Sequence, residues 1–132
     1  MSASEPGPAR PLVCRGVRGA TSAEANTRDA ILAATRDLLE ALVEANGIDP
    51  ADIASVFLTA TPDLDADFPA QAARQMGWDD AALLCAQEMA VPTAKLGLIR
   101  VLIHWNTTRL ASEIHHVYLK GAAALRPDRA RS

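Results

Sequence analysis

The segment from Leu98 to Thr107 constrains the fold most, because it is the strongest strand signal in the chain and carries a charge within it. Every second residue belongs to one apolar face, made of Ile99, Val101, Ile103 and Trp105. The other face places Arg100 between two leucines. A guanidinium stays charged in proteins, so Arg100 must reach water or bind an anionic or strongly accepting group. An Asp or Glu across the sheet is the ordinary partner of such an arginine.

Two further arginines favour a ligand over an ordinary ion pair. Arg18 lies in a second strand-like run and Arg74 lies in a third segment, and the sequence offers no obvious acidic partner for these several arginines. Arg15, close to Arg18, falls on the opposite face of its strand. The sequence therefore predicts a binding site for an anionic ligand, with a pairing carboxylate as the alternative.

Composition limits the kind of protein that can carry this site. A chain of 132 residues with 49% hydrophobic content forms a single domain, and only 4% aromatic residues leave the core to Ala, Leu, Val and Ile. The net charge of −3 and the lack of a basic run argue against nucleic acid as a partner. No apolar run reaches membrane-spanning length. Cys14 and Cys85 are isolated thiols, which are typical of a reducing cytosol.

Strands and helices alternate along the chain. Besides the strand over 98–107, we expect strands over 12–20, 53–60 and 117–119, and a short buried strand over 81–85. We expect one long helix that is capped by Asn26 or Thr27 and ends at Asn46-Gly47. Shorter helical segments are expected as a capped turn over 49–52, a helix from near Pro69 to Gly77, and a turn of helix over 121–125. The two glycines in 12–20 weaken that strand or admit a close neighbour. A single domain over 12–128 lies between flexible tails at 1–11 and 129–132.

Two clusters invite a metal interpretation that the sequence does not favour. Asp63, Asp65 and Asp67 alternate, but hard cations need more oxygen ligands and usually a turn glycine. Solvated aspartates near a helix N-terminus are the simpler interpretation. His115 and His116 are adjacent, so they face opposite ways in a strand, and no third ligand pattern accompanies them. We expect no metal site.

Six separated motifs occur in order between about Cys14 and Asp128. They are Arg-Gly-Val-Arg-Gly-Ala-Thr at 15–21, Ala-Thr-Pro-Asp-Leu at 60–64, Phe-Pro-Ala at 68–70, Cys-Ala-Gln-Glu-Met at 85–89, Ile-Arg-Val at 99–101, and His-Val-Tyr-Leu at 116–119 with Leu-Arg-Pro at 125–127. In these residues the chain resembles the monofunctional chorismate mutases of the trimeric mixed α/β class, which is distinct from the all-helical class. The resemblance implies an α+β fold: a mixed β-sheet packed with one long and one or two short helices, forming a trimeric pseudo-α/β barrel.

The activity that this resemblance implies is the pericyclic rearrangement of chorismate to prephenate, for phenylalanine and tyrosine biosynthesis. It needs no cofactor, metal, covalent intermediate or obligatory proton transfer, so the protein contributes by holding the folded conformer and stabilising developing charge. The substrate is a dicarboxylate with one hydroxyl group. The implied enzyme is a cytoplasmic homotrimer with active sites at the subunit interfaces, and without nucleic-acid or membrane partners.

Catalytic roles follow from the same resemblance. Arg100 bridges the ether oxygen and the side-chain carboxylate of the substrate, where negative charge develops. Arg18 and Tyr118 hold that carboxylate. Glu88 accepts a hydrogen bond from the ring hydroxyl, and the backbone of Cys85 assists it.

Further binding roles are implied for the neighbouring subunit and for the C-terminal segment. Phe68 packs on the substrate and Arg74 lies near its second carboxylate, both from the neighbouring subunit. Leu125 and Arg126 close the site. Gln71, one turn before Arg74 on the same side of its helix, stands where the family often has a lysine. This departure is expected to weaken binding more than chemistry.

Two other functions remain open. A trimeric imine or enamine deaminase of similar architecture would also use a carboxylate-binding arginine, but it would not need Arg18, Glu88 and Arg100 together. A non-catalytic carboxylate-binding sensor would keep the arginines and lack turnover.

Overall fold

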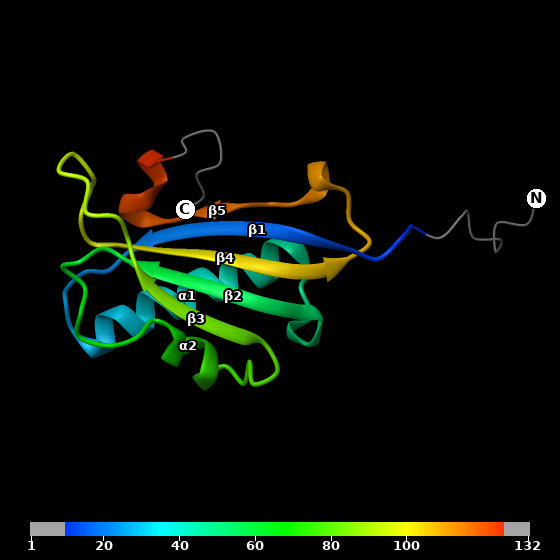
Figure 1. Cartoon of the computed structure of the whole chain (residues 1–132), viewed down its shortest axis with the longest axis horizontal. Helices are drawn as coiled ribbons and strands as arrows, with labels where there is room; N and C mark the ends of the chain where they lie inside the picture. The colour runs from blue at the N-terminus through cyan, green and yellow to red at the C-terminus, as the bar shows by residue number, and fades with distance from the viewer. Residues whose placement is uncertain (1–9, 126–132) are drawn as a thin grey trace, which may run out of the picture.

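The computed structural model describes residues 10–125. One five-stranded mixed sheet has the order β3-β2-β4-β1-β5, with β4 in the middle (Figure 1). β4 runs antiparallel to β1 and β2, whereas β3 is parallel to β2 and β5 is parallel to β1. The strands are β1 (Val13–Ser22), β2 (Ile53–Ala60), β3 (Ala82–Gln87), β4 (Leu98–Thr107) and β5 (Val117–Tyr118). The helices are α1 (Arg28–Asn46), α2 (Ala70–Gln75) and the 3₁₀ helices η1 (Pro50–Asp52), η2 (Ala111–Glu113) and η3 (Lys120–Leu125).

β4 confirms the strongest sequence prediction, both in its bounds and in its two faces. Its apolar residues Ile99, Val101 and Ile103 are buried, while Arg100 is exposed. A central strand with hydrogen-bonded neighbours on both sides can bury one face along its whole length, which is why the period-two pattern is so clear. β1, β2 and β5 also match their predicted ranges closely.

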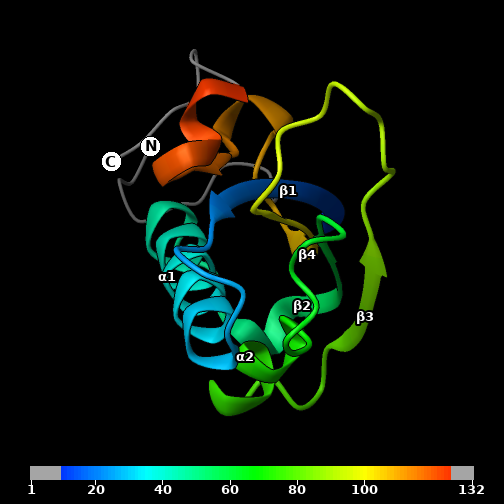
Figure 2. The ribbon, with the colours of Figure 1, turned by 90° about the vertical axis from the view of Figure 1, so that its left-hand side faces the viewer.

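α1 and α2 cover one face of the sheet (Figure 2). α1 begins where expected, because the Thr27 hydroxyl accepts a hydrogen bond from Ala30 N, and it ends at Gly47, whose φ is 68°. Leu38 and Leu42 lie in the main core cluster. A Cβ on Gly19 would lie 2.9 Å from Leu42 Cδ1, so this glycine lets α1 pack closely on β1.

The predicted buried strand over 81–85 is wrong in its burial. β3 forms at Ala82–Gln87, but it is the edge strand and the helices cover only one of its faces. Leu83 and Cys85 pack against the core on that face. Leu84 points to the uncovered face and is 58% exposed. A short apolar run does not reveal whether one or both of its faces are covered.

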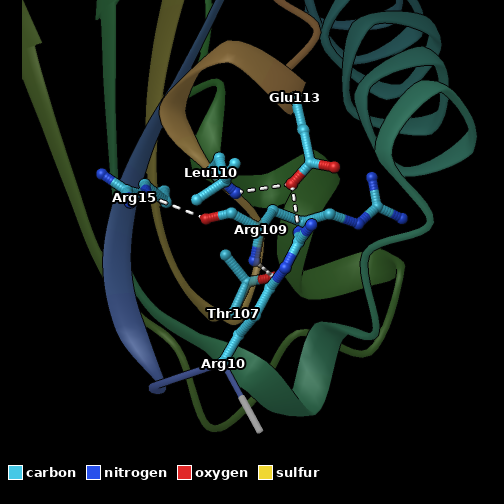
Figure 3. Close-up of polar contacts among 6 residues, drawn as sticks. All are labelled: Arg10, Arg15, Thr107, Arg109, Leu110 and Glu113. Atoms are coloured by element: carbon cyan, nitrogen blue, oxygen red, sulfur yellow. Dashed lines mark hydrogen bonds and ion pairs between the residues drawn. The ribbon is translucent and has the colours of Figure 1, made fainter. Parts of the chain in front are cut away.

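Polar contacts hold the end of β4 next to the start of β1 (Figure 3). Arg15 Nε donates to the backbone oxygen of Arg109 at 3.0 Å. Glu113 Oε1 accepts from Leu110 N at 2.7 Å and from Arg10 Nη1 at 2.6 Å. The Leu110 N–H, followed by the Arg10 guanidinium, holds the pKa of Glu113 below its usual range. These contacts tie the start of β1 to the segment after β4, at the end of the sheet away from Arg100.

The remaining predicted elements are present, except where the prediction lies outside the described residues. η1 has the expected cap, since an Asp49 carboxylate oxygen accepts from Ala51 N at 3.0 Å. η3 is the expected turn of helix after β5. Most of the tail predicted over 1–11, the tail over 129–132 and Arg126 lie outside the described residues. Among the helices of residues 10–125, none combines the length and apolar content needed to cross a bilayer.

Candidate active site

The face of the sheet opposite the helices carries a cavity of about 300 Å³. β4 is paired so that Ala20 of β1 and Thr59 of β2 lie on either side of Arg100, and Tyr118 of β5 is the partner of Ala20. Directly paired residues share a face of the sheet. The cavity is lined by Arg18, Gly19, Ala20, Phe57, Thr59, Arg100, Val101, Leu102 and Tyr118. Two predicted catalytic arginines and the predicted tyrosine thus meet at one site.

Arg100 has an acidic partner that the sequence did not reveal. Its Nε lies 2.6 Å from Glu88 Oε1, and the side chains of Arg100 and Glu88 are 47% and 24% exposed. Arg100 therefore has the pairing carboxylate that the sequence left open as the alternative to a ligand. Glu88 directly follows β3, which is not adjacent to β4, so this contact depends on the fold and not on any local spacing.

Glu88 has two more anchors. Its backbone N donates to Ala60 O at 2.9 Å, which holds the start of the 88–97 connection at the end of β2. The Thr59 hydroxyl donates to Glu88 Oε1 at 2.9 Å. Sequence reasoning missed Thr59, although a hydroxyl in the apolar β2 was a usable signal.

Arg18 and Tyr118 reach the cavity from the other edge of the sheet. The backbone N–H of Arg18 donates to His116 Nδ1 at 2.9 Å, which ties the approach to β5 onto β1. Tyr118 is buried beside Ala20 and Leu98, and Leu125 packs against this cluster. Leu125 therefore lies close to Tyr118.

Phe68, Cys85, Gln71 and Arg74 are not brought into this cavity by the chain itself. Phe68 is 66% exposed and lines a separate cavity of about 400 Å³ together with Cys85. Arg74 lines a third cavity of about 230 Å³. Arg74 Nη1 donates to Gln71 Oε1 at 2.8 Å, so these two residues do lie on the same side of α2.

The aspartates that alternate before α2 have three different partners. An Asp63 oxygen accepts from Gly97 N at 3.3 Å, Asp65 contacts Asn26, and Asp67 pairs with Arg28 at 3.0 Å. Within residues 10–125, no three His, Cys, Asp or Glu side chains are grouped as a metal site requires. The three carboxylates hold the loop before α2 rather than forming one cluster.

The chemistry available at the cavity is charge recognition. Two guanidinium groups and a phenol are suited to a carboxylate and to an oxygen that gains negative charge. The Glu88 carboxylate beside them can accept a hydrogen bond from a hydroxyl group.

Known proteins resemble this chain over most of its length. Residues 14–129 match the family described as chorismate mutase type I. Chorismate mutase AroH of Thermus thermophilus is 48% identical over 115 residues, covering 86% of this chain and 94% of that protein. Chorismate mutase AroH of Bacillus subtilis (strain 168) is 42% identical over 118 residues, covering 89% and 93%.

The fold agrees with this assignment. A solved chorismate mutase structure from Clostridium thermocellum matches with a TM-score of 0.82 and 47% identity, over 83% of this chain and 98% of that one. The family match, the sequence identities and the shared fold each extend over most of the chain, and the protein therefore belongs to the chorismate mutase type I family.

Proposed function

We propose that this protein is an isomerase that converts chorismate to prephenate in the cavity on the open face of the sheet. The observation that carries this proposal is the meeting of Arg18, Arg100 and Tyr118 in one cavity, with the Glu88 carboxylate bonded to Arg100. Family membership supports it independently. The reaction breaks a carbon–oxygen ether bond and forms a carbon–carbon bond in one step, and it belongs to phenylalanine and tyrosine biosynthesis.

Arg100 is the main electrostatic catalyst in this proposal. Its Nε is engaged by Glu88, and a guanidinium has further N–H donors for the ether oxygen and the side-chain carboxylate. The ether oxygen gains negative charge as its bond to carbon breaks, so a fixed cation stabilises the transition state more than the ground state.

The other residues select the reactive conformer. Arg18 and Tyr118 bind the side-chain carboxylate, and Glu88 accepts from the ring hydroxyl. The Cys85 side chain packs against the core, so its contribution is limited to its backbone groups. Holding both ends of the substrate makes the folded conformer the bound one, which lowers the entropic part of the barrier.

A second chain completes the site in this proposal. Phe68 and Arg74 line cavities that are separate from the Arg100 cavity, and Phe68 is largely exposed. The open face also exposes Phe57, at 40%, and Leu84. A closed ring of three chains, forming a pseudo-α/β barrel, would cover these apolar residues and bring Phe68 and Arg74 of one chain to Arg100 of the next.

The proposal also covers the residues at the edge of the site, the extent of the catalytic domain and the cellular location. Gln71 replaces a cation near the second carboxylate, and Leu125 and Arg126 close the site. Residues 12–128 form the catalytic domain, which needs no cofactor or metal. The free thiols of Cys14 and Cys85 support a cytoplasmic location.

An assay of purified protein tests this function. Chorismate absorbance should fall and prephenate should appear in equal amount, well above the uncatalysed rate, and the rate should be unchanged after treatment with a chelator. Binding of chorismate without turnover would favour the sensor, whereas turnover of an imine but not of chorismate would favour the deaminase. Loss of activity with the chelator would contradict the metal-free mechanism.

A further inference from the structure

Thr59 contacts the same oxygen of Glu88 that Arg100 does. The Thr59 hydroxyl donates to Glu88 Oε1 at 2.9 Å, and Arg100 Nε lies 2.6 Å from that atom. Thr59 also lines the cavity that Arg18, Arg100 and Tyr118 share. Two donors thus converge on Oε1, and neither of these contacts uses the second carboxylate oxygen, Oε2.

The two donors differ in stiffness. Thr59 sits in β2 with a paired strand on each side, opposite Arg100 of β4 and Ala86 of β3. A β-branched side chain in a strand has few χ1 rotamers, so its hydroxyl is held in place. Arg100 has a long and half-exposed side chain, and Glu88 itself lies on a connection just beyond β3. Thr59 is therefore the rigid contact of the three residues.

We infer that Thr59 is a positioning residue for the reaction, and this inference rests on the proposed function. Its hydroxyl keeps Glu88 Oε1 in place while the Arg100 guanidinium binds the substrate, which leaves Oε2 for the ring hydroxyl. The ring hydroxyl takes no part in the bond changes and stays neutral throughout the reaction. Its hydrogen bond to Glu88 therefore stabilises ground and transition states alike, and losing its alignment raises KM more than it lowers kcat.

Two matched substitutions test this role. Thr59→Val keeps the shape of the side chain and removes the hydroxyl, whereas Thr59→Ser keeps the hydroxyl and removes the methyl group. We expect Thr59→Val to raise KM about tenfold with kcat within about threefold of wild type, which is the size of one lost hydrogen bond to a charged group. Thr59→Ser should stay within about threefold in KM. A residue that only packs would give the reverse order, because valine fills the space better than serine does, and that order would overturn the inference.

A second arm asks whether Thr59 acts through Glu88. In a Glu88→Ala protein, adding Thr59→Val should change kcat/KM by less than about twofold, because the acceptor of the hydroxyl is already gone. The same tenfold loss in that background would overturn the inference. Thermal unfolding of each variant verifies that it is folded. A wild-type protein that converts chorismate, together with an unaffected Thr59→Val variant, would overturn this inference alone. A wild-type protein without turnover would overturn the proposed function and this inference with it.

Discussion

The pairing of Arg100 with Glu88 determines which ligands the candidate site can bind. A partly exposed ion pair contributes little to stability, typically about 1 kcal/mol or less, so this pair has little value as a structural contact. Its position beside Arg18 and Tyr118 suits a ligand that has both a carboxylate and a hydroxyl group. We also expect the contact with Glu88 to orient the guanidinium before substrate arrives.

Removal of the Arg100 charge is expected to affect chemistry more than folding. Arg100→Ala should lower kcat by on the order of 10² to 10³, because a donor that meets developing negative charge is lost. Arg100→Lys should restore only part of this rate, since an ammonium group cannot bridge two acceptors as a guanidinium does. Steady-state kinetics on folded protein measure both effects.

Arg36→Ala is the control for the loss of an arginine, because Arg36 lies on α1 and pairs with Glu40 at 3.8 Å. Its kcat should equal that of wild type. A folded Arg100→Ala protein with near-normal kcat would rule out the proposed role of Arg100.

Gln71 offers a test in the opposite direction, namely a gain of binding. Gln71 Oε1 accepts a hydrogen bond from Arg74 Nη1. Gln71→Lys would therefore release that donor and add a second cation near the second carboxylate of the substrate. We expect KM to fall about threefold to fivefold with kcat nearly unchanged, the size of one exposed charge pair.

Gln75→Lys, at the exposed end of the same helix, controls for the added charge and should leave KM unchanged. An equal fall in KM for both variants would show that general attraction of an anion, and not the position of Gln71, is responsible.

At the scale of elements, the sequence predicted those parts of the fold that local patterns control. β4 and α1 follow their hydrophobic periodicity, and their ends follow from capping residues such as Thr27 and Gly47. The exposure of Leu84 was missed because it depends on where β3 lies in the sheet. The contacts of Glu88 with Arg100 and Thr59 were missed for a related reason: they join segments that only the tertiary fold brings together.

The loop between β2 and α2 makes stability depend on pH. The Thr61 hydroxyl, and more weakly the Gly97 N–H, hold the pKa of Asp63 below its usual value of 3.8. A pKa that is lower in the folded state contributes stability above the unfolded value, and this stability is lost as the pH falls through the folded value. The free energy of unfolding should therefore decrease below about pH 4, and Asp63→Asn should remove part of that decrease, less than about 1 kcal/mol for so exposed a group.

Denaturant unfolding at a series of pH values between about 3 and 6 measures this dependence. Asp80→Asn, at another exposed loop position, is the matched control and should keep the wild-type pH dependence. If Asp63→Asn and wild type lose stability in parallel as the pH falls, the contacts of Asp63 do not contribute in the way proposed.

For the whole molecule, we propose that each active site is built from two chains. Arg100 lies in one cavity, whereas Phe68 and Arg74 lie in others, and the open face of the sheet is apolar where a neighbour would cover it. The sequence family suggested this division of the site, but a single chain's periodicity contains no information about a neighbouring chain. Only a measurement on the assembled protein can therefore show whether two chains share a site.

The most direct measurement combines two inactive proteins, Arg100→Ala and the double variant Phe68→Ala/Arg74→Ala. In a closed ring, each interface joins the Arg100 half of one chain to the Phe68 half of the next, so any mixed trimer contains one interface with both halves intact. Random equal mixing makes roughly three quarters of the trimers mixed and repairs one site in three of those. After the two proteins are unfolded and refolded together, about a quarter of wild-type activity should return, whereas each protein refolded alone stays inactive. No gain in activity after verified subunit exchange would mean that the site is built within one chain, and would rule out the shared interface site.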